Sequence, residues 1–313
     1  MTISVRALLY LVIVCSATGL LQAQVHIQQE DNRISVEING KPFTALWKGE
    51  DANKPFLYPL CTASGKPVTR AFPMEKVTGE STDHPHQRSL WIGAEHVSGI
   101  DFWENEPSYQ RPNKGTIKFR KVLAAHDGKD QGDLTILAQW LSPNGEALID
   151  ETLKLTFYAK PEQNRMFDVD LQLKARKKLV FEDDHDAILG LRLGTPFEEK
   201  SGGKVVNAEG IEGADHIRGT HSAWADWQAN LEGEQVGVAI MDSPRNFRFP
   251  TPWHVRPYGM LFASPFAQHD FSPALPDGSL TLQSGNELHL RYRILIHPAN
   301  VPVASVFEQF ATK

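Results

Sequence analysis

Alternation of apolar and polar residues is the clearest pattern along this chain, and its period is two. It runs without a break through Phe167–Lys174 and recurs in Thr152–Phe157 and Leu288–Ile294. Side chains alternate between the two faces of a strand, so this pattern predicts strands with one buried and one wet face. Shorter strands are predicted at Arg33–Ile38, Thr116–Val122, Leu134–Trp140 and Val236–Met241.

Turn signals separate the predicted strands, and helical patterns are scarce. Lys160–Asn164 lies between two alternating runs and predicts a hairpin loop. The one convincing helical stripe is in the tail, where four apolar residues fit one face of a short helix. Many strands and few helices predict an all-β fold, and we expect a large β-sandwich with few short helices. The stripe consists of Val303, Val306, Phe307 and Phe310.

Two long stretches interrupt the strand pattern, Pro59–Pro112 and Asn207–Asp270. Both are rich in His, Trp, Pro, Gly and Asp. Long irregular segments on a β scaffold usually carry function. We therefore expect the chemistry in these stretches, in one pocket formed where both meet at one end of the sandwich.

The first stretch concentrates polar side chains in Thr82–Trp91. Pro85 favours extended geometry for His84, which would point it to the same side as His86. An imidazole beside a carboxylate can move protons near neutral pH. The candidate catalytic residues are His84, His86, His254, Asp83 and Asp101.

The second stretch repeats this chemistry in Trp253–Arg256, where His254 and Arg256 share a face if the segment is extended. A guanidinium recognises closely spaced oxygens, and an indole offers a flat apolar face to a sugar ring. The expected ligand is therefore a small carbohydrate or glycoside. The candidate substrate-binding residues are Arg88, Arg256, Trp91, Trp103, Trp253, His221 and Asp226.

Four further acidic residues are candidates for a catalytic acid or base. Glu95, Glu104, Glu209 and Glu212 lie in the same two stretches. The cluster Glu182–Asp184 is interpreted instead as solvated charge near a strand end, and its neighbour His185 is not assigned to the site.

Composition and the first residues limit the partners and the location. The net charge is −6 and no basic stripe is present, so no nucleic-acid partner is expected. Arg6 followed by the apolar run Ala7–Leu21 predicts an export signal of residues 1–23, cleaved after Ala23. The run is too short for a membrane span. We expect an exported, periplasmic or secreted protein whose residues 24–313 form a single β-sandwich domain. The sequence leaves its oligomeric state open.

Cofactor motifs are missing from the sequence. It contains no H-E-x-x-H, CxxC or calcium-loop pattern. It also contains no nucleophile elbow, phosphate loop or dinucleotide fingerprint. No cofactor is therefore expected. The alternative is a divalent metal held by His84, His86 and His254, since two imidazoles on one face can bind such an ion.

Three blocks resemble the family catalogued as "PmoA family", whose members are otherwise called domains of unknown function. The blocks are Asp83–Gly93, Val97–Trp103 and Pro250–Gly259. The chain departs from the family pattern at Phe181–Ala187. The resemblance implies an exported bacterial protein linked to carbohydrate use. The label comes from a methane oxygenase membrane subunit, which needs several spanning helices that this chain lacks.

The late strands ending in Leu290–His297 are similar to those of the galactose-mutarotase type of β-supersandwich. That resemblance implies sugar binding in an open groove. Three functions follow from the sequence. The first is an enzyme that acts on a sugar or glycoside as an epimerase, hydrolase or lyase. The second is a non-catalytic glycan-binding module. The third and weakest is a metal-dependent oxygenase, as the family label suggests.

Overall fold

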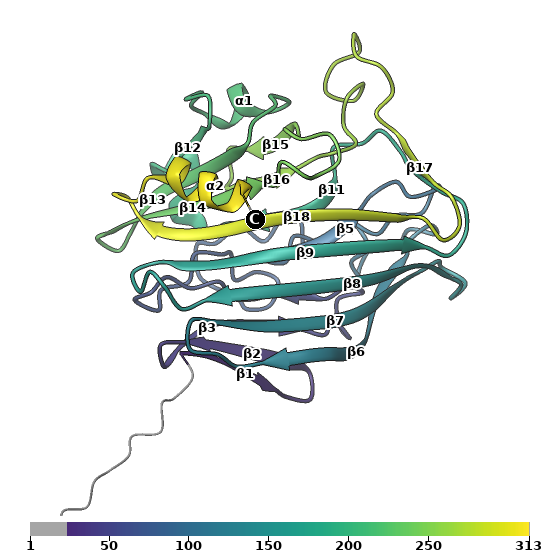
Figure 1. Ribbon diagram of the computed structural model, residues 1–313. Coiled ribbons are helices and arrows are strands. Elements are labelled where there is room, and N and C mark those ends of the chain that lie inside the picture. Colours follow the sequence, from purple (N-terminus) through teal and green to yellow (C-terminus); the bar gives the residue numbers. More distant parts are fainter. Residues whose placement is uncertain (1–23, 313) are drawn as a thin grey trace, which may run out of the picture.

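The computed structural model describes residues 24–312, and the predicted export signal lies outside this range. Two antiparallel eight-stranded sheets face each other (Figure 1). Sheet A contains, in spatial order, β1 (Val25–Gln29), β2 (Arg33–Ile38), β3 (Lys41–Trp47), β4 (Phe56–Leu57), β5 (Leu90–Ala94), β11 (Ala187–Arg192), β16 (Met260–Ala263) and β15 (Trp253–Arg256).

Sheet B is built from the longer strands. Its spatial order is β12 (Lys204–Asn207), β13 (Trp224–Leu231), β14 (Glu234–Asp242), β18 (Glu287–Pro298), β9 (Arg165–Ala175), β8 (Ala147–Tyr158), β7 (Gln131–Leu141) and β6 (Thr116–His126). A small ribbon pairs β10 (Leu179–Phe181) with β17 (Leu280–Leu282). The helices are α1 (Ala214–Ile217), α2 (Val303–Ala311) and the 3₁₀ turns η1 (Thr195–Phe197) and η2 (Glu199–Ser201).

The period-two pattern predicted this architecture correctly. Every strand predicted from alternation lies within a strand of sheet A or B, and the tail helix is α2. The all-β sandwich is therefore confirmed. One expectation has to be corrected, because the stretch Asn207–Asp270 is not irregular throughout. Besides β14, which was predicted at Val236–Met241, it contains β13, β15 and β16.

The main core fills the space between the two sheets. Phe43 of sheet A packs edge-on against Phe157 and Phe167 of sheet B, with ring centroids 6.1 and 5.8 Å away. On the far side of sheet B, α2 covers β14 and β18 with Val303 and Phe310. None of the helices within residues 24–312 is long and apolar enough to cross a membrane.

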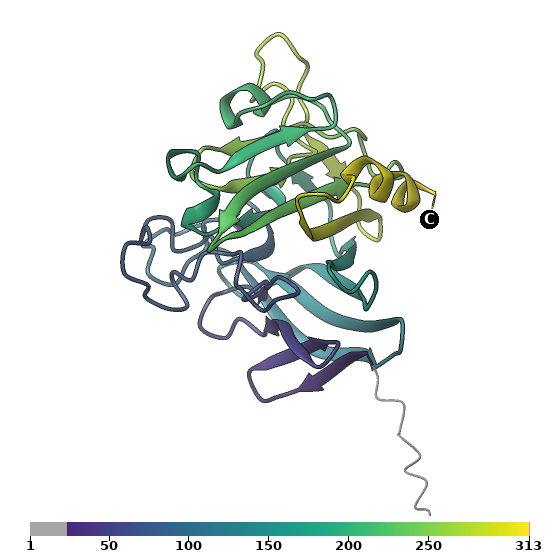
Figure 2. The same cartoon turned by 90° about the vertical axis from the view of Figure 1, so that its left-hand side faces the viewer.

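A second apolar cluster lies on the outer face of sheet A, away from sheet B. It contains Phe56, Trp91, Trp103, Met260 and Phe262. Loops of the first long stretch cover it, and Figure 2 shows these blue segments on the side of the molecule opposite α2. The loops thus have their own packed base, which fixes the polar side chains they carry.

Candidate functional site

The candidate site lies on the outer face of sheet A, where a row of paired residues crosses four strands. Trp91 on β5 pairs with Gly190 on β11. Gly190 pairs with Phe262 on β16, which pairs with His254 on β15. Residues paired across neighbouring strands point to the same side of a sheet. His254 therefore shares this face with Trp91, and alternation turns its neighbour Trp253 into the main core.

The two long stretches meet on this face. The imidazole of His84 stacks on the ring of Tyr258, with centroids 5.8 Å apart and planes 18° apart. Tyr258 lies in the turn between β15 and β16. The structure therefore brings residues of the two stretches together as predicted, but on the outer face of sheet A and not at one end of the sandwich.

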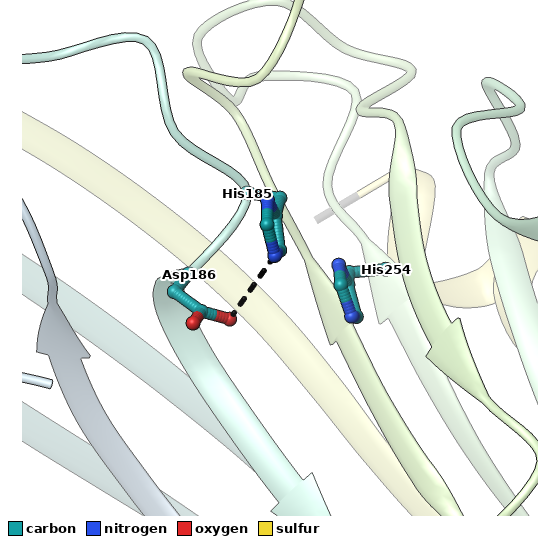
Figure 3. Close-up of side chains that lie close together, drawn as sticks. All are labelled: His185, Asp186 and His254. Carbon is teal, nitrogen blue, oxygen red and sulfur yellow. Dashed lines mark ion pairs between the residues drawn. The ribbon is translucent and has the colours of Figure 1, made fainter. Parts of the chain in front are cut away.

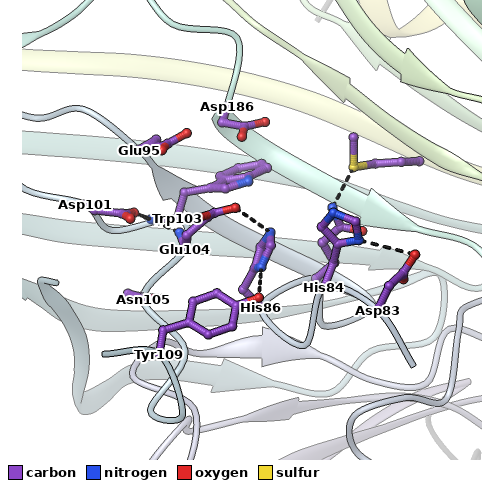
Figure 4. Close-up of polar contacts among 12 residues, drawn as sticks. Asp83, His84, His86, Glu95, Asp101, Trp103, Glu104, Asn105, Tyr109 and Asp186 are labelled. Carbon is purple, nitrogen blue, oxygen red and sulfur yellow. Dashed lines mark hydrogen bonds and ion pairs between the residues drawn. The ribbon is translucent and has the colours of Figure 1, made fainter. Parts of the chain in front are cut away.

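His86 lies at the centre of the site (Figure 4). Its Nδ1 is 3.0 Å from the Tyr109 hydroxyl oxygen, and its Nε2 is 4.0 Å from a carboxylate oxygen of Glu104. Burial, followed by the positive charge of Lys54, lowers the pKa of His86 to about 2. The ring is therefore neutral, and it can donate or accept hydrogen bonds without carrying charge.

Asp83 anchors the loop that carries His84. One carboxylate oxygen accepts hydrogen bonds from Arg70 Nη1 at 2.6 Å and from Arg192 Nη2 at 3.3 Å. The other oxygen is 3.3 Å from His84 Nδ1. Although partial burial alone would raise the pKa of Asp83, the Arg192 charge holds it below its ordinary value. Asp83 is therefore an ionised anchor that also orients His84.

The backbone of His84 differs from the prediction. Its φ is +44°, in the left-handed region, so the segment is not extended there. The carbonyl oxygen of His84 accepts a hydrogen bond from buried Arg70 at 2.8 Å, which favours the turn over the extended form. The rings of His84 and His86 are still neighbours, with centroids 5.6 Å apart and planes 76° apart.

Carboxyl groups continue the site beyond His86. Glu95, Asp101 and Glu104 offer carboxylate oxygens within 4.8 Å of one another. Arg111 partly neutralises them, since its Nη1 is 3.3 Å from Asp101 and its Nη2 pairs with Glu104.

Glu95 also shares a hydrogen bond with Asp186, just before β11, so one of these two carboxyl groups carries a proton. Burial raises the pKa of Glu95 to about 7, and the charge of Asp184 adds to this effect. Burial likewise raises the pKa of Asp186 well above its ordinary value, with Glu95 as the next cause. Two like charges this close cannot both form easily, so the pair shares a proton near neutral pH. Both side chains are partly open to solvent.

His254 closes the row on the far side (Figure 3). His185, Asp186 and His254 each offer a ligand atom within 4.8 Å of the others. The rings of His185 and His254 stack with centroids 4.3 Å apart. Burial, then the influence of the neighbouring His185, lowers the pKa of His254 to about 2. The His185 side chain, left out of the predicted site, is therefore part of it.

A continuous line of titratable groups results, which we call the polar ribbon. Each neighbouring pair is joined by one of the contacts described above. In order across the outer face of sheet A it consists of Asp83, His84, His86, Glu104, Glu95, Asp186, His185 and His254. The near end opens into a cleft of about 530 Å³ lined by His84, Glu104, Ser108, Tyr109, Gln110 and Arg111.

Tryptophan side chains form the base of the site but offer no open face. Trp91 and Trp103 are 1% and 0% exposed, with centroids 4.9 Å apart. A Cβ on Gly190 would lie 2.4 Å from the Trp91 ring and 2.8 Å from Trp103, so glycine is required there. The expectation that these indoles stack on a sugar is corrected: the loops bury them. The aromatic ring of Tyr109 does line the cleft.

Several predicted site residues serve the fold. Asp101 accepts the backbone N–H groups of Trp103 and Glu104, both at 2.8 Å, so it shapes the loop and orients no imidazole. Arg88 pairs through two nitrogens with buried Glu106, so its fork is already occupied. Trp253 lies in the core and donates to the Ser222 carbonyl oxygen at 2.8 Å.

The structure does not bring His221 and Asp226 to the polar ribbon, and their predicted placement is corrected. Asp226 lies on β13 in sheet B and is 3.2 Å from Nε2 of His297, in a buried pair. His221 is exposed and contacts the Pro250 carbonyl oxygen at 2.7 Å. Arg256 does lie on the same face as His254, with its guanidinium 5.9 Å from the centre of the Tyr258 ring.

The predicted metal set does not fit the geometry. Among residues 24–312, three groups of side chains offer mutually close ligand atoms, and neither His84 nor His86 belongs to any of them. His254 groups with His185 and Asp186 instead. A metal bound jointly by His84, His86 and His254 is therefore not supported.

Sequence reasoning missed Tyr109, Arg111, Asp186 and His185. Tyr109 and Arg111 lie in the first long stretch, where an aromatic and a cation next to Glu104 could have been noted. Asp186 and His185 follow an acidic cluster that looked like solvated charge. Only strand pairing reveals them, because β11 pairs with β5 and so places Asp186 near Glu95.

Solved structures that resemble this protein do so at low sequence identity and low structural similarity. Heparan sulfate lyase HepC from Pedobacter heparinus matches with a TM-score of 0.38 and 9% identity over 89% of this chain and 35% of the lyase. This chain thus spans about a third of that protein. A protein of Escherichia coli provisionally described as an aldose 1-epimerase matches with a TM-score of 0.38 and 9% identity, over 88% of this chain and all of that one. At this level of similarity, neither match assigns an activity.

No curated protein matches the sequence. One family model does, over residues 33–311, which includes both sheets almost completely and the whole polar ribbon. The chain therefore belongs to the family described as "Family of unknown function (DUF6807)".

Proposed function

We propose that this protein is an exported enzyme that acts on a small carbohydrate or glycoside by acid–base chemistry on the polar ribbon. The supporting observation is the Glu95–Asp186 pair, which holds a proton beside neutral His86 and open Glu104. A sugar presents adjacent hydroxyl groups, each a donor and an acceptor. A line of neighbouring imidazole and carboxyl groups matches such a ligand.

The roles differ from those expected from the sequence. His86, first taken as the leading proton carrier, is too buried to hold a proton near neutral pH. We assign proton donation to the Glu95–Asp186 pair, because a pKa near 7 suits general acid catalysis at neutral pH. Glu104 pairs with Arg111 at its side and is the candidate base. His86 then orients Glu104 and the ligand through its ring nitrogens.

A non-catalytic glycan-binding module is the second candidate. A binder of that kind uses exposed flat rings, whereas Trp91, Trp103 and Trp253 are all buried. It also needs no proton-sharing carboxyl pair. Both features favour the enzyme. The oxygenase suggested by the "PmoA" label is not proposed, since the predicted histidine set does not converge.

A substrate screen tests the proposal. The purified protein is incubated with mono- and oligosaccharide libraries, and binding is read by thermal shift and turnover by product analysis. The hit is then tested with Glu95→Gln, Glu104→Gln and the matched control His126→Ala, an exposed histidine on β6. General acid–base groups contribute about 10²–10⁴-fold to rate. We expect losses of that size for Glu95→Gln and Glu104→Gln, with ligand binding kept and the control unchanged.

Two results would contradict the proposal. A ligand that binds but yields no product under any condition supports the binding module. Full turnover in both carboxamide variants would remove the acid–base roles assigned here.

A further inference from the structure

His185, Asp186 and His254 combine ligand types that transition metals prefer. Imidazole nitrogens suit zinc, copper, iron and nickel, and a set of two imidazoles and one carboxylate leaves coordination positions open. His254 lies on β15, and His185 and Asp186 lie just before β11; their ligand atoms lie within 4.8 Å of one another. Figure 3 shows the three side chains close together, with the two imidazoles side by side.

The orientation of His185 matches that of a metal ligand. Its Nδ1 is 2.5 Å from a carboxylate oxygen of Asp270. Its Nε2 faces Asp186, 4.0 Å from a carboxylate oxygen. Histidines that bind metals commonly give their second nitrogen to a carboxylate, which fixes the ring and makes the ligand nitrogen more basic. Asp270 is in turn held by Asp183, which accepts its backbone N–H at 3.1 Å.

His254 supplies an independent observation. Its side chain is only 3% exposed, yet its Nδ1 has no hydrogen-bond partner among residues 24–312. A buried polar atom without a partner costs roughly 1–3 kcal/mol and calls for an explanation. A bound cation explains why this side chain is buried beside His185 and Asp186.

We propose that His185, Asp186 and His254 form a mononuclear site for a divalent first-row transition ion, with Asp270 as the positioning residue behind His185. The rings now stack with planes 8° apart, so their lone pairs converge only when the His254 ring turns. Its Nδ1 has no hydrogen-bond partner within the described part of the chain, so this turn breaks no hydrogen bond there.

The metal site goes beyond the proposed sugar chemistry and does not depend on it. The two are separated by variants, because Glu95→Gln removes the proposed acid but none of the three metal ligands. Loss of turnover with retained metal in Glu95→Gln would therefore concern the reaction alone.

The test is titration of the full protein, freed of metal by chelation, with Co²⁺ and Zn²⁺. Binding is measured by calorimetry and by the visible absorption of protein-bound Co²⁺. His254→Phe keeps a ring stacked on Phe262 but removes the nitrogens, and His185→Phe likewise keeps a ring stacked on residue 254. Thermal unfolding checks that each variant folds. The matched controls are His96→Ala, from the neighbouring group Glu95–His96–Asp184, and His126→Ala.

We expect one bound ion per chain in the wild type and unchanged binding in both controls. Asp270→Asn should weaken binding by about 10–100-fold, as outer ligand partners do. His254→Phe and His185→Phe should each weaken metal binding by more than Asp270→Asn does. The proposal is overturned if the folded wild type binds no stoichiometric ion, if both phenylalanine variants bind as tightly as the wild type, or if His96→Ala alone abolishes binding.

Discussion

The ion pair between Arg88 and Glu106 shows whether Arg88 stabilises the fold or binds the ligand. Their side chains are 11% and 7% exposed, and two guanidinium nitrogens contact the two carboxylate oxygens. Removing one partner of a buried pair leaves the other charge unpaired and costs about 3–5 kcal/mol. Glu106→Gln keeps the shape and one acceptor, so we expect a loss near the lower end, about 3 kcal/mol.

The assay is urea unfolding with linear extrapolation, supported by thermal unfolding. In a large domain, 1 kcal/mol shifts the melting temperature by about 2 °C, so Glu106→Gln should melt about 6 °C lower. The matched control is Glu287→Gln, which removes an exposed pair with Lys174 at 3.1 Å. It should cost less than about 0.5 kcal/mol.

A paired replacement isolates the charge effect. Arg88→Met combined with Glu106→Leu removes both charges and should recover most of the loss, because well-packed apolar side chains often replace a buried ion pair at little cost. If Glu106→Gln proves as stable as the wild type, Arg88 is not committed to Glu106. The sequence-based expectation that Arg88 binds substrate oxygens would then regain support.

Three further predictions concern packing, pH and loop order. Gly190→Ala places a Cβ 2.4 Å from the Trp91 ring, so denaturant unfolding should show that the free energy of unfolding falls by about 1–3 kcal/mol. An unchanged free energy would mean that the contact between Trp91 and Trp103 is loosely packed. The pKa of Glu95 rises on folding from 4.5 to about 7, so the folded state holds the proton more tightly. The unfolding free energy of the wild type should therefore fall relative to that of Glu95→Gln as the pH rises from 4.5 to about 7. Parallel pH profiles of the two proteins would contradict this prediction. The carboxylate of Asp183 accepts backbone N–H groups from residues 268, 269, 270 and 278. Asp183→Asn should therefore speed limited proteolysis of this loop. The control is Asp170→Asn, which changes an exposed acid paired with His289 and should leave the rate of proteolysis unchanged.

The sequence by itself determined the fold class and much of the position of the site. Period-two alternation depends only on adjacent residues, because the strand geometry turns each side chain to the face opposite its neighbour. It therefore predicted β8, β9 and β18 and the all-β sandwich. Clustering of His84, His86 and Glu104 in one stretch also depends on local sequence alone, and these residues do lie together.

Only the tertiary structure decided which distant residues join them. Whether a charge is a ligand, a brace or a solvated group depends on what strand pairing places beside it. Pairing of β11 with β5 brings Asp186 to Glu95, while the position of β13 in sheet B removes Asp226 from the site. Burial, which sets the pKa of His86 and of Glu95, likewise arises from packed loops and not from neighbours in sequence.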